Sequence, residues 1–308
     1  HEPSDGVVPY DVVATLYADD SLKSRFLVLP PDTTIGYREN AAWDFPVGSI
    51  LIKTFYLNHD DRDLSLGRQV VETRLLVREP QGWEPYIYLW DDSQTSAKLH
   101  QVGKWIDMEW IDAEGAGRAL RYRVPNKNQC KNCHGQDDFF EPLGPSSRQL
   151  NRDYDFGNGP ENQIEYFQAL GLLDQQPPPT SEIFTLADPL GTESLERRAR
   201  SYLDANCSHC HNDQGSAAPS GLKLSIFVEE ALEYGQCRRP VAAGGGSGGF
   251  EFDIKPGHSD QSIMIFRMTS VDPEIKMPEI PTQTADLFGV DLISQWIDAM
   301  TPSECDGI

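Results

Sequence analysis

Two short segments of the chain share one pattern, in which two cysteines are separated by two residues and the second is followed at once by histidine. The segments are Cys130–His134 and Cys207–His211. Both match the C-x-x-C-H signature of covalent c-type haem attachment, in which two thiols bond to one porphyrin and the adjacent imidazole binds its iron. The pattern predicts two haem c groups with His134 and His211 as iron ligands. The expected thioether cysteines are Cys130, Cys133, Cys207 and Cys210.

Three other uses of paired cysteines fit the pattern less well. A four-cysteine zinc site is expected to have its pairs roughly 15 to 20 residues apart. A much longer segment separates Cys133 from Cys207, and zinc would leave both trailing histidines unexplained. A thioredoxin-like pair needs a βαβ setting that neither segment shows, and a disulfide framework is typical of much shorter chains.

The two remaining cysteines, Cys237 and Cys305, are predicted to form a disulfide that ties a long loop to the C-terminal tail. The alternative is two separate thiols. Because covalent haem is attached outside the cytoplasm, where disulfides are also stable, we expect an exported protein in the periplasm or outside the cell.

Length and charge narrow the possible functions further. The 308 residues are enough for two domains. The formal net charge of −22 would repel a phosphate backbone, which excludes nucleic-acid binding as a function class. We expect a redox partner with a basic docking surface, although such a charge also serves solubility alone. The sequence contains no apolar run long enough for a membrane span and no signal-peptide pattern, and it does not predict an oligomeric state.

The N-terminal part of the chain is predicted to be rich in β-strands. Short segments of β-branched and aromatic residues are separated by turn residues at 49–56, 69–77 and 86–90. Near Trp105 the pattern alternates, which places Ile106, Met108 and Trp110 on one face of a half-buried strand. We therefore expect a β-rich domain over residues 1–124.

The rest of the chain is predicted to be mainly helical, so that the fold class is α+β. Residues 125–185 form a first haem-binding segment with a helix over 161–173 and a Pro-rich linker at 175–180. Residues 186–308 form a cytochrome c-like domain. Its expected elements are a helix capped by Thr192 that runs through Leu203 and ends where Cys207 begins, a mobile Gly-rich loop at 243–249, and a terminal helix over 291–300.

The second axial position of each iron decides between electron transfer and substrate chemistry. For the second haem we predict Met277, because it lies in a proline-rich loop before the terminal helix, where a rigid backbone can present sulfur to iron. The other methionines of this region, Met264, Met268 and Met300, have apolar helical settings typical of a core.

The first haem has no obvious second ligand, because no methionine lies between His134 and Met264. The position is either open or filled by a residue distant in sequence. The candidates are Met108, His100, His59, His258 and His209. Separately, His1 could bind a metal through its amine and ring, with a second histidine that the sequence does not identify.

Several runs of residues resemble a family of exported bacterial di-haem c-type cytochromes of unassigned function. In the N-terminal part the runs are 45–55, 72–77, 82–83, 125–130 and 149–152. The C-terminal part is similar to planctomycete-type cytochrome c domains at 198–203, 207–211, 256–257, 262, 267–268, 277–278 and 296–297. The resemblance implies covalent haem on the four motif cysteines, with His134, His211 and Met277 as axial ligands. It implies no substrate, and His258 stands where such domains carry an acid after the glycine.

The expected function is single-electron transfer between exported redox partners. One alternative is a di-haem peroxidase or oxidase with an open first haem, for which Glu141 or His100 would be the acid–base candidate. Another is a binding or assembly module, in which the β-rich domain docks a partner and the haems conduct electrons. Its aromatic platform would consist of Trp83, Tyr86, Tyr88 and Trp90, although alternating strand aromatics are more often core.

Overall fold

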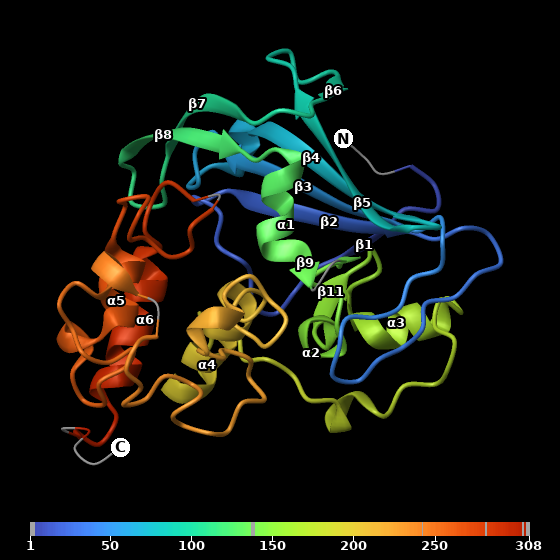
Figure 1. The fold of residues 1–308 in the computed structure, drawn as a ribbon. Helices are drawn as coiled ribbons and strands as arrows, with labels where there is room; N and C mark the ends of the chain where they lie inside the picture. Colours follow the sequence, from blue (N-terminus) through green and yellow to red (C-terminus); the bar gives the residue numbers. More distant parts are fainter. Residues whose placement is uncertain (1–3, 137–138, 242, 281, 304, 306–308) are drawn as a thin grey trace. The chain divides into compact units, whose positions relative to one another are not determined.

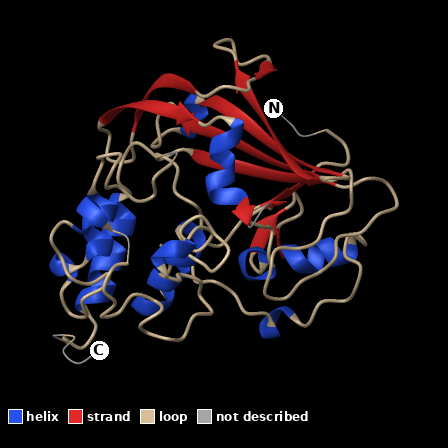
Figure 2. Cartoon of the chain, viewed as in Figure 1, coloured by secondary structure: helices blue, strands red, loops and turns tan. Residues whose placement is uncertain are grey.

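The computed structural model describes residues 4–136, 139–241, 243–280, 282–303 and 305, and these form two compact units. The first unit takes its residues from 1–13, 20–134 and 139–186, and the second from 14–19, 135–138 and 187–308. Helix makes up 22% and strand 26% of the structure, so the chain has the expected α+β class. Figures 1 and 2 show the chain by sequence position and by secondary structure.

The first unit is built on a six-stranded antiparallel sheet whose strands follow one another in chain order. Its strands are β1 (Val8–Tyr10), β2 (Leu22–Val28), β3 (Ile50–Asn58), β4 (Arg68–Glu79), β5 (Gly82–Trp90) and β6 (Ala97–Leu99). The strands expected over 49–56, 69–77 and 86–90 are present as β3, β4 and β5. A separate hairpin pairs β7 (Lys104–Ile111) with β8 (Gly117–Val124). Along β7, Met108 and Trp110 are buried while Asp107 and Glu109 are exposed, as the alternation predicts.

Short helices and strands follow the hairpin. The helices of the first unit are α1 (Lys127–His134), α2 (Ser147–Leu150), α3 (Gln163–Ala169) and the 3-10 turns η1 (Leu64–Leu66) and η2 (Thr180–Glu182). The short strands are β9 (Gly135–Gln136), β10 (Phe139–Phe140), β11 (Asp153–Asp155) and β12 (Pro160–Asn162). The helix expected over 161–173 is therefore shorter at both ends. Asn162 caps the start of α3 by accepting a hydrogen bond from the Ile164 N–H. Just after the helix, Gly171 adopts the left-handed conformation with a φ of +68°.

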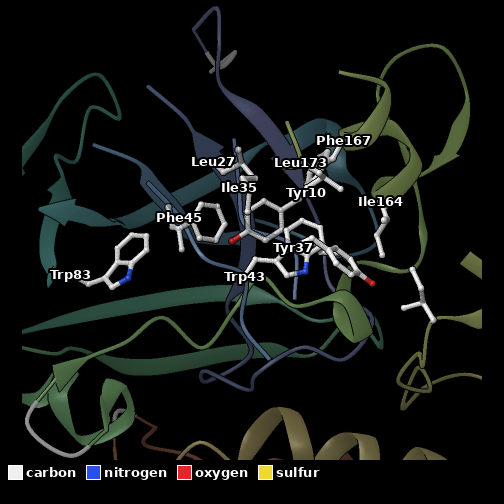
Figure 3. Close-up of a cluster of buried hydrophobic side chains, with 13 residues drawn as sticks. Tyr10, Leu27, Ile35, Tyr37, Trp43, Phe45, Trp83, Ile164, Phe167 and Leu173 are labelled. Carbon is white, nitrogen blue, oxygen red and sulfur yellow. The ribbon is translucent and has the colours of Figure 1, made fainter. Parts of the chain in front are cut away.

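One face of the six-stranded sheet is buried by two separate apolar clusters. The first cluster joins strand residues such as Leu27, Leu51 and Trp83 to Ile164 and Phe167 of α3. Figure 3 shows Leu27, Trp83, Ile164 and Phe167 of this cluster with the rings of Tyr37, Trp43 and Phe45. The second cluster joins Leu57, Ile87 and Leu89 to residues of the β7–β8 hairpin. Residues 139–186 supply core side chains to the first cluster, so they group with the strands, as do residues 125–134.

Helices joined by long loops make up the described part of the second unit (Figure 2). They are α4 (Leu195–Asn206), α5 (Ile263–Thr269) and α6 (Leu287–Asp298), with 3-10 turns η3 (Ala218–Ser220), η4 (Gly244–Ser247) and η5 (Ser259–Gln261). The cap of α4 is Ser194, whose Oγ accepts a hydrogen bond from the Arg197 N–H, and not Thr192 as expected. The Gly-rich segment 243–249, expected as a shapeless loop, contains η4, and Gly246 within it is buried against Arg267.

The disulfide pair in the structure is Cys237 with Cys305, the two cysteines left over from the motifs. Their sulfur atoms are 2.05 Å apart and both residues are buried beside Phe252. The 68-residue separation between them spans α5, the Met277 loop and α6. The bond therefore closes the half of the unit that carries the expected methionine ligand.

Helices α4 and α6 cross where α6 carries a glycine. A Cβ added at Gly289 would lie 2.1 Å from the Tyr202 hydroxyl oxygen of α4. That hydroxyl donates to the Asp286 carboxylate at 2.9 Å, and Asp286 in turn caps α6 by accepting from the Gly289 N–H. The small residue at position 289 is thus what allows the two helices to approach.

We expect Gly289→Ala to destabilise the protein by about 1–3 kcal/mol, because overpacking this crossing outweighs the helix propensity that alanine adds. Chemical denaturation of the variant measures the change. Gly245→Ala is the matched control, since a Cβ at Gly245 meets no atom within 4 Å. Equal stabilities for Gly289→Ala and Gly245→Ala would contradict this account of the crossing.

Candidate functional site

The first C-x-x-C-H motif lies on helix α1. The helix begins with a reciprocal cap, in which the Asn126 side chain accepts from the Gln129 N–H at 2.9 Å and the Gln129 side chain accepts from the Asn126 N–H at 3.0 Å. This cap places Cys130 one turn into the helix, where it packs against the second apolar cluster of the sheet. Burial raises the pKa of the Cys130 thiol. Cys133 and His134 occupy the last turn of α1.

The His134 ring is held in a fixed orientation by the segment that follows the motif. Its Nδ1 lies 2.8 Å from the Glu141 carbonyl oxygen, and the ring stacks on Phe140 with the centroids 4.9 Å apart. A neutral histidine whose Nδ1–H donates to a carbonyl has its Nε2 unprotonated and available to a metal. The Glu141 carbonyl thus fixes the ring orientation of His134, the expected proximal ligand.

The second motif forms a tight turn directly after helix α4. The Cys207 N–H donates to the Leu203 carbonyl at 2.9 Å, and the His211 N–H donates to the Cys207 carbonyl at 2.9 Å. Burial raises the pKa of the Cys207 thiol to about 12 and lowers the pKa of His211, which keeps this imidazole neutral. A neutral imidazole is the form that ligates iron.

His211 and Met277 line the same cavity, although they are far apart in sequence. The cavity holds about 690 Å³ of empty space, part of it open to solvent. Cys207 lines it beside His211, and most other walls are apolar side chains such as Leu203, Leu222 and Ile263. A flat apolar cofactor with one thioether and two axial iron ligands matches this set of lining groups.

Polar groups occupy only part of the cavity wall. They include Asp253, Arg267 and Ser220. Burial raises the pKa of Asp253 to about 6, against the opposing effect of the arginines Arg238 and Arg267. Ser220 orients the His211 ring, because its hydroxyl donates to the Ala217 carbonyl and lies 3.4 Å from His211 Nδ1, from which it can accept. An apolar body with a polar end is also the shape of a haem with its propionates.

The loop that carries Met277 is fastened on both sides. The Met277 N–H donates to the Arg267 carbonyl at 2.9 Å. The buried Lys276 ammonium donates to the carbonyls of Pro278 and Glu279, at 2.8 and 2.5 Å. A loop held in this way can present a thioether without losing much further conformational freedom on ligation. Met264 and Met268 also line the cavity, so it contains three methionines.

Residues 14–19, near the start of the chain, belong to this second unit and brace the site. The Tyr17 N–H donates to the side chain of Asn206, the last residue before the second motif. The Asp19 carboxylate accepts from the backbone N–H groups of Gln283 and Thr284, at 2.7 to 2.9 Å, just beyond the Met277 loop. Sequence reasoning missed Asp19 and Asn206, because no local pattern links positions so distant along the chain.

The candidate second ligands of the first motif are spread over both units. Met108 is 2% exposed and belongs to the same apolar cluster against which Cys130 packs. His59 is exposed, whereas His100 has a buried Nε2 without a hydrogen-bond partner among the described residues. His209 and His258 lie in the second unit, and His1 is outside the described residues. The identity of this ligand stays a prediction.

The strand aromatics fall on opposite faces of β5. Trp83 is buried in the first cluster. Tyr86, Tyr88 and Trp90 are an odd number of residues away from it along the strand, so they lie half-buried on the other face. Tyr86 donates to Glu79 and the Trp90 indole donates to Thr73. Trp83 therefore cannot be part of an aromatic platform with the other three.

Comparisons with protein-family profiles, with curated proteins and with solved structures find no match to this chain. Among the described residues, none of the helices combines the length and the apolar character that crossing a bilayer requires. The functional interpretation therefore depends on the residues and geometry of the chain itself.

Proposed function

We propose that this protein is an exported di-haem c-type cytochrome that passes single electrons between redox partners. The observation that carries the proposal is the cavity of the second unit, where His211, Met277 and Cys207 meet among apolar walls. The C-x-x-C-H pattern and the cavity are independent, because the pattern is local in sequence whereas Met277 is brought to it only by the fold. Together they support one haem in this cavity and, by the shared motif, a second at α1.

A bound haem c supplies a reversible one-electron iron couple, and the protein sets its potential. In the second unit, Cys207 and Cys210 would tether the group, while His211 and Met277 would hold the iron. Apolar walls lower the local dielectric constant and thioether ligation favours the reduced iron, so we expect a comparatively high potential at this site. At α1, Cys130, Cys133 and His134 would hold the other haem, with the ring of His134 oriented by Glu141.

The charge of the chain supports a partner with a basic surface. A protein with a net charge of −22 attracts cationic proteins over long distances, and salt screens this attraction. We expect the second-order rate constant of electron exchange with a basic cytochrome to fall by about tenfold or more as salt rises from low to near-physiological concentration. The Cys237–Cys305 disulfide agrees with an oxidising compartment such as the periplasm or the cell exterior.

Removing one cysteine pair at a time tests the haem assignment. Cys130→Ala/Cys133→Ala and Cys207→Ala/Cys210→Ala should each lose one of two covalent haems, as read by intact mass and by the haem absorbance per polypeptide after acid–acetone extraction. Cys237→Ser/Cys305→Ser is the control and should retain both. A purified wild-type chain with the mass of bare polypeptide would refute the proposal.

The electron-transfer role itself is separated from enzyme action by assay with hydrogen peroxide. We expect reversible reduction and oxidation of the haem-loaded protein without catalytic consumption of peroxide. Catalytic turnover that is lost in Cys130→Ala/Cys133→Ala would instead establish a peroxidase with an open first haem.

A further inference from the structure

Three cationic side chains stand side by side across the middle of the six-stranded sheet. Arg25 of β2 is directly opposite Lys53 of β3, and Lys53 is directly opposite Arg74 of β4. Directly opposed residues on neighbouring antiparallel strands point to the same face, with their Cβ atoms about 5 Å apart. Like charges in this position destabilise a sheet unless anions offset them.

The two arginines have counter-ions, but the lysine between them has none among the described residues. Arg25 pairs with Asp11 at 2.8 Å, and Arg74 forms a two-pronged pair with the fully buried Glu72 at 2.5 and 3.0 Å. Lys53 makes no hydrogen bond or ion pair with any of the described residues. Asp11 is moreover shared with Arg152 at 3.3 Å, which leaves the row with an excess of positive charge.

The row lies where water is largely excluded. On the same face of β3, Leu51 on one side of Lys53 belongs to the first apolar cluster, and Leu57 on the other side belongs to the second. Between them, the buried Phe55 carries the Arg74 guanidinium 4.2 Å above its ring. Burial, followed by the charges of Arg25, Arg74 and Lys23, lowers the pKa of Lys53 to about 7. A cation kept in such a setting without a partner is costly to the fold.

We propose that Arg25, Lys53 and Arg74 form a binding site for a small oxyanion on the inner face of the sheet. The guanidinium groups offer planar donors and Lys53 offers the uncompensated charge, a combination suited to carboxylate, sulfate or phosphate oxygens. Cys130 and Cys133 lie within electrostatic reach of Arg74 and Lys53, respectively. The oxyanion is therefore either a diffusible ion or a carboxylate of a haem bound at α1. The diffusible ion does not depend on the proposed function, whereas the haem carboxylate rests on it.

Calorimetric titration with sulfate tests the site, in chloride at constant ionic strength and at a pH about one unit below the pKa of Lys53. We expect sulfate binding that Lys53→Met weakens by about tenfold or more and Lys53→Arg largely preserves. Lys98→Met, on the exposed edge strand β6, is the control and should bind as the wild type does. Because Lys53→Met removes a buried uncompensated charge, the variant should fold.

Repeating the titration with Cys130→Ala/Cys133→Ala distinguishes the two sources. Equal sulfate binding with and without these cysteines identifies a site for a diffusible oxyanion, whereas binding that appears only in their absence identifies a haem carboxylate as the resident group. No sulfate binding in either protein, or equal affinity in Lys53→Met and Lys98→Met, would overturn the proposal. So would a high-spin shift of the haem spectrum in Lys53→Met without sulfate binding, since Lys53 would then be an iron ligand.

Discussion

Met277→Ala is expected to abolish the weak long-wavelength absorption band that marks thioether-ligated ferric haem. It should also lower the reduction potential of the second haem by roughly a few tenths of a volt, within the about 0.8 V span that axial ligands control. The reason is that the Met277 loop would then supply no sulfur ligand, so water or a stronger donor would occupy the second axial position of the iron. Spectra of the oxidised protein and a potentiometric titration measure both effects.

Three methionines line the cavity, and their variants provide the control. Met264→Leu and Met268→Leu change side chains buried in the α5 core but should leave the band and the potential nearly unchanged, as should Met300→Leu outside the cavity. If the band survives in Met277→Ala and disappears in Met264→Leu or Met268→Leu, the ligand is on α5 and the role assigned to the Met277 loop is wrong.

Cys237→Ser/Cys305→Ser is expected to lower the free energy of unfolding by about 4 kcal/mol, as the loop-closure entropy of a 68-residue separation predicts. Because the closed loop contains α5, Met277 and α6, the loss should also loosen the methionine side of the cavity. Guanidinium denaturation of the oxidised and reduced wild type, beside the variant, measures the stability change.

The matching functional readout is ligand exchange at the second haem. Imidazole added to the disulfide variant should displace the thioether at lower concentration than in the wild type, since a looser loop holds Met277 less firmly. Cys207→Ala/Cys210→Ala, in which the second haem is absent, should show no such spectral change. A variant as stable as the wild type, with the same imidazole affinity, would contradict this role of the bond.

Secondary structure was predictable where one local pattern dominated. The alternation from Ile106 to Trp110 placed Met108 and Trp110 on the buried face of β7, and the strands of residues 49–90 were found within a few residues of their expected ends. Helix ends were predicted wrongly where capping residues, and not the spacing of apolar residues, set them. Apolar spacing suggested a helix over 161–173, but α3 begins after its cap Asn162 and ends at Ala169, before Gly171. Ser194 rather than Thr192 caps α4.

The sequence by itself determined the two C-x-x-C-H motifs, the leftover cysteine pair and the choice of Met277, because each depends on residue identity and short spacing. Only the tertiary structure brought Met277 into the cavity of His211, joined Asp19 to the loop beyond it and aligned Arg25, Lys53 and Arg74 across three strands. These relations depend on strand register and chain reversal, which long-range packing decides and no local pattern encodes.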